Sequence, residues 1–425
     1  MDALIIEGPA RLKGSVSISG SKNTALPLLF TSLLFDREVT FSNVPRLWDI
    51  ETTLKLLETM GVTSHWDKEQ GEISIMPTVI HKVAPYEWVR RMRAGILALG
   101  PLVARYGEAK VSLPGGCAIG ARPVNYHLEA MRKMGVSVEV EEGYVKARLK
   151  GSLKGAHISF PQVTVTGTEN LLILAAVAEG NSVIENAARE PEVVALGELL
   201  IRCGARMSGL GTSLIEVQGS TTLRHPEGKI VIPSDRIETG TWISIAAATR
   251  SELILQNVEI DQMGSVIRAF ESMGVRFHLM AESRALRVEP ADHYHPVDIE
   301  TAPYPGFPTD MQAQLLTALC LAEGKSRVRE NIFENRFMHV AELHRMGARI
   351  TIHENEAIVE GPVTLQGAPI MATDLRASAS LVVAGLCAQG RTKISRIYHL
   401  DRGYQRLDRK LNQVGAHIER VKEDS

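Results

Sequence analysis

Residues 49–62, DIETTLKLLETMGV, carry a pattern that repeats through the whole chain. Asp49 can cap a helix in which Ile50, Leu54 and Leu57 share one face, and this helix stops at Gly61. Glycine suits such a helix end because it adopts the left-handed conformation without a Cβ clash. Five later segments end in the same way: Met134-Gly135-Val136, Cys203-Gly204-Ala205, Met273-Gly274-Val275, Met346-Gly347-Ala348 and Val414-Gly415-Ala416. These six glycines lie about 70 residues apart, which predicts six copies of one structural unit.

Each predicted unit combines helices with strands. In the first unit, residues 25–34 form an apolar helix and residues 39–44 alternate as a strand does; residues 252–258 and 392–397 repeat the strand pattern. A unit of about 70 residues cannot bury both of its faces alone, so the copies must pack on one another. The sequence therefore predicts an α/β protein with two lobes of three units each. The boundary between the two lobes is expected near residues 228–233.

Composition and charge exclude several classes of protein. The chain has 425 residues, of which 44% are hydrophobic and 23% are charged, and its formal net charge is -2. Such a chain forms a large core but has no long-range positive field that would attract nucleic acid or anionic lipid. It lacks a signal-peptide pattern and any apolar run near the roughly 20 residues of a membrane span. We therefore predict a cytoplasmic protein that binds neither nucleic acid nor membranes.

The cysteines and histidines do not form a recognisable metal site. Cys117, Cys203, Cys320 and Cys387 are widely separated and lack CxxC spacing. Residues 293–295, His-Tyr-His, have no further ligands nearby in the sequence, which is more typical of a surface loop. No metal is predicted.

Polar residues gather where the first helix of each unit begins. These starts are Ser21-Lys22-Asn23, Met92-Arg93-Ala94, Gly167-Thr168-Glu169-Asn170, Asp235-Arg236-Ile237-Glu238-Thr239, Thr309-Asp310 and Asp374-Leu375-Arg376. Unsatisfied N–H groups and the helix dipole favour anions at such positions, and Lys22, Arg93 and Arg376 add full charges. A phosphate or carboxylate ligand is expected. Each residue alone could instead be a simple cap, and we interpret Glu169, Glu238 and Thr239 in that way.

The loop LPGGCAIGARP (residues 113–123) contains a second candidate group, Cys117. Its glycines indicate an exposed, flexible loop, and Arg122 lies five residues away. Exposure and nearby positive charge favour a reactive thiolate, although spacing alone also fits an incidental loop thiol. The other three cysteines lie in apolar stretches and are expected to pack as small hydrophobes.

Six motifs together resemble the UDP-N-acetylglucosamine 1-carboxyvinyltransferase family over essentially the whole chain. They are SGSKNTALP (19–27), LPGGCAIGARP (113–123), FPTDM (307–311), FENRF (333–337), DLRAS (374–378) and DRGY (401–404). The resemblance implies two inverted α/β barrel domains built from six βαβαββ units, three per domain. It implies an N-terminal lobe of residues 22–231 and a C-terminal lobe of residues 1–21 and 232–425.

The resemblance also implies a reaction. The enolpyruvyl group of phosphoenolpyruvate is transferred to the 3-hydroxyl of UDP-N-acetylglucosamine with release of phosphate, the first committed step of peptidoglycan synthesis. Addition followed by elimination needs an acid, a base and groups that hold the anion. By motif, Cys117 matches the acid, with the capacity to trap phosphoenolpyruvate covalently, and Asp310 matches the base. Lys22, Arg122 and Arg402 match the groups that hold phosphate and carboxylate.

The remaining matched positions contact substrate or belong to the site. Those that match contacts to the nucleotide sugar are Asn23, Arg93, Arg122, Pro123, Val124, Asn125, Tyr126, Gln162, Val163, Thr164, Val165 and Ile332. Asp374 matches a catalytic polar residue, and Arg336 and Arg376 match substrate-binding residues. No cofactor is implied beyond the possible adduct on Cys117.

Two departures from the family pattern concern the nucleotide sugar. The family often has aspartate where this chain has Asn125, and Ser-Val-Gly-Ala where residues 164–167 read Thr-Val-Thr-Gly, with Thr166 in the third position. The alternatives are the sister family of 3-phosphoshikimate 1-carboxyvinyltransferases and a non-catalytic scaffold that binds nucleotide sugars. The presence of Cys117 predicts inactivation by fosfomycin. We expect a monomer.

Overall fold

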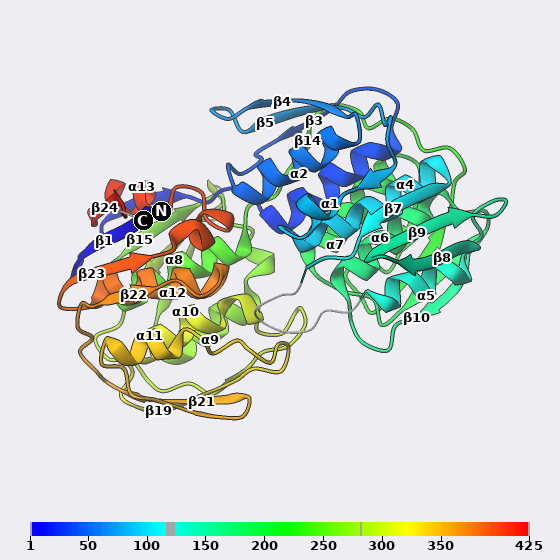
Figure 1. Ribbon diagram of the computed structural model, residues 1–425. Helices are drawn as coiled ribbons and strands as arrows, with labels where there is room; N and C mark the ends of the chain where they lie inside the picture. Colours follow the sequence, from blue (N-terminus) through cyan, green and yellow to red (C-terminus); the bar gives the residue numbers. More distant parts are fainter. Residues whose placement is uncertain (1, 116–123, 281–282, 424–425) are drawn as a thin grey trace. The chain divides into compact units, whose positions relative to one another are not determined.

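The computed structural model describes residues 2–115, 124–280 and 283–423 (Figure 1). These residues form two compact units. The N-terminal unit contains residues 20–115 and 124–233, and the C-terminal unit contains residues 2–19 and 234–423. Each unit has its own core of buried apolar side chains. The first strands of the chain therefore belong to the C-terminal unit.

The C-terminal unit contains three four-stranded sheets. Their strand orders are β22(Pro369–Met371)-β23(Gly390–Ser395)-β1(Asp2–Gly8)-β24(His417–Lys422), β16(Arg276–Met280)-β17(Ala285–Glu289)-β15(Leu253–Gln256)-β2(Gly14–Ser17) and β18(Ile299–Glu300)-β19(Gly324–Arg329)-β21(Glu356–Gly361)-β20(Ile350–His353). The N-terminal strand β1 lies between β23 and β24 and is antiparallel to both (Figure 1). The start of the chain thus completes the sheet made by its end.

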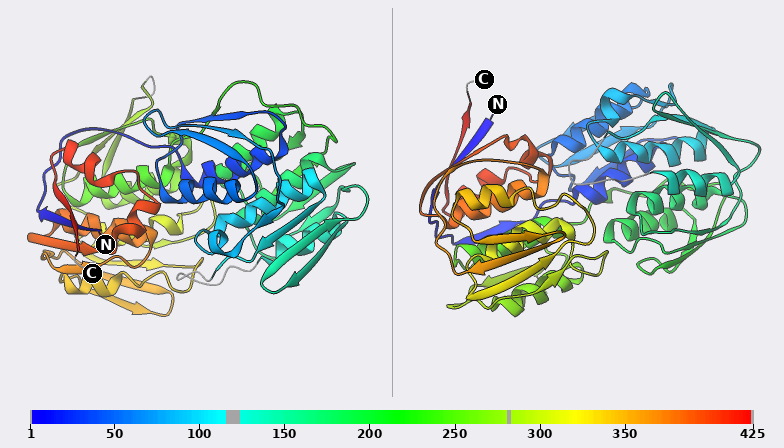
Figure 2. Two further views of the ribbon diagram at one scale, coloured as in Figure 1. Left: turned by 45° about the horizontal axis from the view of Figure 1, so that its top comes forward. Right: turned by 60° about the horizontal axis from the view of Figure 1, so that its bottom comes forward.

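The N-terminal unit also contains three four-stranded sheets. Their strand orders are β14(Ile230–Val231)-β3(Val39–Ser42)-β5(Glu72–Met76)-β4(Thr63–Asp67), β6(Val83–Ala84)-β7(Glu108–Ser112)-β9(Tyr144–Leu149)-β8(Val136–Glu141) and β10(His157–Ser159)-β11(Asn181–Glu185)-β13(Leu214–Gln218)-β12(Arg206–Ser208). In Figure 2 the helices of each unit pack against its sheets. Strands such as β5 and β13 alternate between buried and more exposed side chains.

All six sheets share one topology. A short edge strand runs parallel to its neighbour, and the next two pairings are antiparallel, as in β18–β19, β19–β21 and β21–β20. The other five sheets pair in the same way. The predicted architecture, α/β with six repeated units, is therefore confirmed.

Each repeat has an inner helix that is largely buried. The inner helices are α1 (Lys22–Thr31), α4 (Leu99–Tyr106), α6 (Val165–Val177), α8 (Arg236–Ala248), α10 (Gln312–Leu319) and α12 (Leu375–Cys387). The 3₁₀ turns η2 (Arg93–Ala98) and η5 (Thr309–Met311) lead directly into α4 and α10. Because these helices are apolar nearly all round, their polar first turns are the places where charged groups enter the interior of a unit.

Each repeat also has a second, outer helix with one buried face. The outer helices are α2 (Trp48–Thr59), α5 (Asn125–Lys133), α7 (Pro191–Arg202), α9 (Gly264–Met273), α11 (Val340–Arg345) and α13 (Leu407–Gln413). The shorter elements are α3 (Tyr86–Val89), η1 (Ser32–Leu34), η3 (Ile260–Gln262) and η6 (Ile397–Arg402). Across the described ranges, none of the helices has the length and apolarity that crossing a membrane requires.

The repeat glycines have the backbone conformation that the sequence pattern predicts. Each follows an outer helix, and all six have a positive φ between 92° and 111°: Gly61, Gly135, Gly204, Gly274, Gly347 and Gly415. Side chains with a Cβ rarely adopt this conformation, which explains why glycine recurs at this point.

Four expected helix caps were wrong, and one of them, Thr239, instead donates its hydroxyl to the backbone carbonyl of Asp235 at 3.0 Å. Helix α2 begins at Trp48 after Leu47, so Asp49 lies inside the first turn instead of capping it. Thr164 caps α6, and Glu169 is a buried residue further along that helix. Asp235 caps α8, whereas Glu238 pairs with Lys410 at a distance of 2.5 Å. In the sequence, a polar residue inside the first turn looks the same as one at the cap position. Only the partner that its side chain contacts in the folded chain distinguishes the two.

Replacement of Gly347 by alanine should destabilise the C-terminal unit without any steric clash. A Cβ at this position would meet no atom within 4 Å, so only the positive φ of 92° opposes it. We expect a loss of about 1–2 kcal/mol in the free energy of unfolding, measured by urea denaturation. Gly347→Asn should lose less, because asparagine tolerates left-handed backbone. Equal stability of wild type and Gly347→Ala would contradict this explanation of the repeat.

Candidate active site

In the C-terminal unit, the carboxylate of Asp310 lies between two arginines. Asp310 belongs to η5, directly before α10. One oxygen, Oδ1, pairs with Arg336, and the other, Oδ2, is 3.0 Å from Nε of Arg376. The arginine side chains are only 5% and 4% exposed, whereas that of Asp310 is 28% exposed. The arrangement holds an ionised carboxylate at an accessible point beside two buried cations.

Asp374 forms a second carboxylate position next to the first. It caps α12, with Oδ1 accepting hydrogen bonds from the backbone N–H groups of Arg376 (2.9 Å) and Ala377 (3.0 Å). The same oxygen is 3.7 Å from Nη1 of Arg336. Its Oδ2 is buried and makes no hydrogen bond to any described residue. Arg336 therefore links Asp310 to Asp374.

Glu330 organises the segment that carries Ile332 and Arg336. Its buried carboxylate accepts hydrogen bonds from the N–H groups of Ile332 (2.8 Å) and Phe333 (3.1 Å) and from the hydroxyls of Thr301 (2.9 Å) and Thr309 (2.8 Å). Thr309 in turn accepts from Nε of Arg336 at 3.2 Å. One buried carboxylate thus fixes both a predicted substrate-binding segment and the arginine beside Asp310.

Arg376 is held by a network from three inner helices and the turn that follows η6. Its guanidinium lies 5.4 Å from the ring centre of Tyr404, whose hydroxyl is 2.9 Å from that of Thr241 and accepts from Nε2 of Gln314 at 3.1 Å. Burial opposes the charge of Arg376, but Tyr404, Asp310 and Asp235 raise its pKa above the ordinary value. Arg376 therefore stays charged inside the unit.

Two histidines that sequence reasoning missed lie near this cluster. His339 is fully buried, and neither ring nitrogen makes a hydrogen bond of ordinary geometry to a described residue. Burial lowers its pKa to about 4, although Asp374 acts in the opposite direction. Burial, followed by Arg396 and Arg402, lowers the pKa of His399. His339 follows the FENRF motif by only two residues, but its burial could not be read from that spacing.

Arg402 lies half-buried at the end of η6. The preceding residue, Asp401, accepts two hydrogen bonds from Arg420 of β24, at 2.9 and 2.7 Å. This bidentate pair fixes the turn that carries Arg402 to the sheet completed by β1.

In the N-terminal unit, Lys22 is the first residue of α1. Ser21 caps the helix by accepting from the N–H of Thr24 at 3.3 Å. Nζ of Lys22 is 3.0 Å from Oδ2 of Asp49, and both side chains are buried. Asn23, the next residue, is half-buried.

The predicted nucleotide-sugar residues of this unit lie at three helix starts. Arg93 begins η2, Asn125 and Tyr126 begin α5 after the buried Val124, and the segment of Gln162, Val163, Thr164 and Val165 begins α6. Gln162, Val163 and Asn125 are exposed.

A buried histidine, His127, connects two of these starts. It was not predicted as a site residue, although it follows Asn125 by two positions. Its ring nitrogens lie 3.4 Å from Nδ2 of Asn170 and 3.5 Å from the hydroxyl of Thr166, both on α6. Burial, and then the charge of Arg93, lowers its pKa to about 3. Thr166, a position that departs from the family pattern, thus contacts a neutral imidazole.

Three predicted residues, Cys117, Arg122 and Pro123, lie outside the described residues. The other three thiols do not resemble reactive ones: burial raises the pKa of Cys203 to about 11 and those of Cys320 and Cys387 to about 12.

The described ranges contain no group of three or more His, Cys, Asp or Glu side chains that could hold a metal. His293 instead pairs with Glu323 at 2.7 Å.

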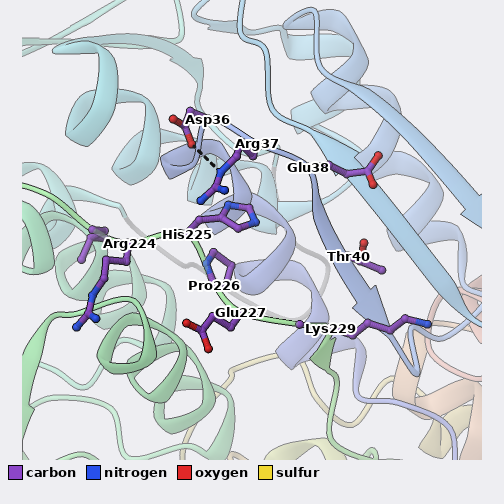
Figure 3. Close-up of a pocket in the computed structure, with 11 residues that line it drawn as sticks. Asp36, Arg37, Glu38, Thr40, Arg224, His225, Pro226, Glu227 and Lys229 are labelled. Atoms are coloured by element: carbon purple, nitrogen blue, oxygen red, sulfur yellow. Dashed lines mark ion pairs between the residues drawn. The ribbon is translucent and has the colours of Figure 1, made fainter.

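A surface depression in the N-terminal unit lies apart from all these residues. It is lined by residues 36–38, Thr40 and residues 223–229, among them Arg37, Arg224 and His225 (Figure 3). Arg37 and Asp36 are 3.9 Å apart and largely exposed. Exposed side chains of both charges do not form a preorganised binding site, and none of the predicted residues lines the depression.

The chain is similar to known proteins over nearly its full length. The family model described as EPSP synthase (3-phosphoshikimate 1-carboxyvinyltransferase) matches residues 6–411. The UDP-N-acetylglucosamine 1-carboxyvinyltransferase of Desulfovibrio desulfuricans is 53% identical over 423 residues, covering 100% of both chains. The protein of that name from Thermodesulfovibrio yellowstonii is 50% identical, covering 99% of this chain and 100% of its own.

Two solved structures share the fold. The enolpyruvyl transferase NikO from Streptomyces tendae superposes with a TM-score of 0.88 at 24% identity, covering 100% of this chain and 99% of its own. An EPSP synthase from Acinetobacter baumannii gives 0.75 at 20% identity, covering 99% and 100%.

The repeated fold and the family model define an enolpyruvyl transferase. With half of its residues identical to the named relatives along their full length, the chain belongs to the UDP-N-acetylglucosamine 1-carboxyvinyltransferase family. The resemblance read from the six motifs is thereby confirmed.

The buried His127 should make stability fall on the acid side of neutrality. Its pKa is about 3 in the folded chain and 6.5 in the ordinary case, so the unfolded chain binds a proton first as the pH drops below about 6.5. From pH 7 to 5 we expect this residue to cost about 2 kcal/mol of unfolding free energy. Urea denaturation at both pH values should show a smaller pH dependence for His127→Gln than for wild type.

The exposed His65 provides the matched control. His65→Gln should keep the pH dependence of the wild type, because this side chain is exposed and is not buried by folding. An unchanged pH dependence in His127→Gln would show that His127 is not the neutral buried group described here.

Proposed function

We propose that this protein transfers the enolpyruvyl group of phosphoenolpyruvate to the 3-hydroxyl of UDP-N-acetylglucosamine and releases phosphate, as the first committed step of peptidoglycan synthesis. One observation carries the proposal: the carboxylate of Asp310 lies between two buried arginines. The chain that contains this cluster is 53% identical over its full length to a UDP-N-acetylglucosamine 1-carboxyvinyltransferase. Those relatives favour this acceptor over 3-phosphoshikimate, the acceptor named for the broader EPSP synthase family.

Asp310 is proposed to accept the proton of the sugar hydroxyl. Arg336 and Arg376 favour its ionised form, and its partial exposure leaves it accessible to a substrate. The oxygen that loses this proton attacks C2 of phosphoenolpyruvate while C3 gains a proton. In the second step C3 loses a proton and the bond from C2 to the phosphate oxygen breaks. Atoms balance, with inorganic phosphate as the leaving group.

Cys117 is proposed as the acid at C3, on the strength of the LPGGCAIGARP motif alone. A covalent adduct of phosphoenolpyruvate on this thiol is a side state that the two steps do not require. No cofactor is proposed.

Lys22, Arg122 and Arg402 are proposed to hold the phosphate and carboxylate of phosphoenolpyruvate. Charge-assisted contacts of this kind are worth most where water is excluded. Lys22 meets that condition, since it is buried at the start of α1. Asp374, which shares Arg336 with Asp310, is proposed to keep that arginine in place during turnover.

The nucleotide sugar is proposed to bind at helix starts. The exposed residues Gln162, Val163 and Asn125 support this proposal, since side chains at such starts can reach a ligand. The remaining proposed contacts are Asn23, Arg93, Arg122, Pro123, Val124, Tyr126, Thr164, Val165, Ile332, Arg336 and Arg376. We further propose that the enzyme acts as a cytoplasmic monomer on these two small substrates.

Phosphate release should depend on the acceptor. With phosphoenolpyruvate, the purified protein should release phosphate when UDP-N-acetylglucosamine is added and not when shikimate 3-phosphate is added. Asp310→Asn should lower kcat by roughly 10²–10⁴-fold, the usual contribution of a general base. Glu323→Gln, which removes an exposed carboxylate of the same unit, should keep wild-type activity. Release only with shikimate 3-phosphate would move the assignment to the sister family, and release with neither would favour a binding scaffold.

Fosfomycin should label one thiol. Its epoxide reacts with a thiolate, and burial keeps Cys203, Cys320 and Cys387 in the thiol form. Intact-mass measurement and a peptide map should show a single adduct on Cys117, lost in Cys117→Ser. An adduct on any of the other three cysteines would contradict the proposed role of the loop.

A further inference from the structure

Lys22 and Asp49 form a buried ion pair in the N-terminal unit. Nζ and Oδ2 are 3.0 Å apart, and the side chains are 10% and 5% exposed. Lys22 opens α1 and Asp49 lies in the first turn of α2, so the pair joins the starts of two helices of one repeat. Buried charges are costly, and a buried pair is weak evidence for stability. A reason other than stability is therefore required.

The position of Lys22 adds a second cost. It lies at the positive end of the α1 dipole, where a cation is unfavourable. The helix does not need it, because Ser21 already caps the N–H of Thr24. The ammonium is kept at a buried helix start although burial and the helix dipole both disfavour a positive charge there. An ammonium at this position can bind an anion that approaches the same helix start. The carboxylate of Asp49, 3.0 Å from the ammonium, offsets part of both costs.

Asp49 lies in the helical backbone at the start of α2. The hydroxyl of Thr53 donates to the carbonyl of Asp49 at 2.9 Å and lies 3.5 Å from Sδ of Met92. Met92 directly precedes Arg93, a proposed nucleotide-sugar contact. The start of α2 thus contacts the residue before Arg93 through Thr53 and the ammonium of Lys22 through Asp49.

We propose that Asp49 is the positioning residue of Lys22: it keeps the ammonium charged and directed along the start of α1 for the anionic groups of phosphoenolpyruvate. The inference rests on the proposed function and adds a residue to it. Asp49 acts through Lys22 and does not touch the substrate. Its negative charge would repel phosphoenolpyruvate if it were not covered by Lys22.

The test compares Asp49→Asn with a matched control on the same helix. Glu51 also lies in the first turn of α2 and pairs with a lysine, Lys68, but that pair is well exposed. In Asp49→Asn the KM for phosphoenolpyruvate should rise by on the order of tenfold or more, with little change in the KM for UDP-N-acetylglucosamine. Asp49→Glu, which restores the charge, should recover most of the loss. Glu51→Gln should behave as wild type.

A double-mutant cycle separates positioning from general damage. If Asp49 acts through Lys22, Asp49→Asn should have almost no further effect on kcat/KM for phosphoenolpyruvate in a Lys22→Ala background. Additive effects of the two substitutions, or an unchanged KM for phosphoenolpyruvate in Asp49→Asn, would overturn the inference about Asp49. In either case, turnover by the wild type would leave the proposed function intact. Absence of wild-type turnover overturns both. If Asp49→Asn does not fold, Asp49→Ser, which leaves room for water beside the ammonium, takes its place with the same expected result.

Discussion

Each repeat buries an apolar helix whose first turn exposes N–H groups that the helix cannot satisfy itself. That constraint must be met six times, and four inner helices meet it with a side-chain cap: Ser21, Thr164, Asp235 and Asp374. A helix start that already attracts negative charge needs only one more charged residue to become an anion site. The same architectural requirement therefore places the caps and three of the candidate catalytic groups, Lys22, Asp310 and Asp374, at or just before the starts of inner helices.

The C-terminal unit shows how charge is tolerated at these starts. Arg336 and Arg376 are almost fully buried, and each is compensated by Asp310, with Asp374 as a second partner of Arg336. Removing one member would leave another charge buried without its partner, which is more costly than the pair itself is worth. The members of this cluster therefore depend on one another: the carboxylate that would accept a proton and the cations around it hold one another in place.

The repeat and the fold class could be predicted because their signals are local. A helix that ends in glycine at positive φ can be recognised from a few neighbouring residues. The six sheets follow because the repeats that contain these helices must pack together. The roles of Asp49, His127 and His339 could not be predicted, because each depends on burial against another element. Asp49 fits the local pattern of a cap, and only the position of Lys22 shows its different role. Helix starts were sufficient to select Lys22, Asp310 and Asp374, but not their partners.

The central claim is that the chain forms a vinyl ether on the 3-oxygen of a nucleotide sugar by protonation and deprotonation at C3. The most direct measurement is NMR and mass analysis of the product formed from phosphoenolpyruvate and UDP-N-acetylglucosamine in deuterated water. We expect an enolpyruvyl ether on the 3-oxygen with deuterium in its methylene group. A substituent on another oxygen, or a methylene group without deuterium, would contradict it.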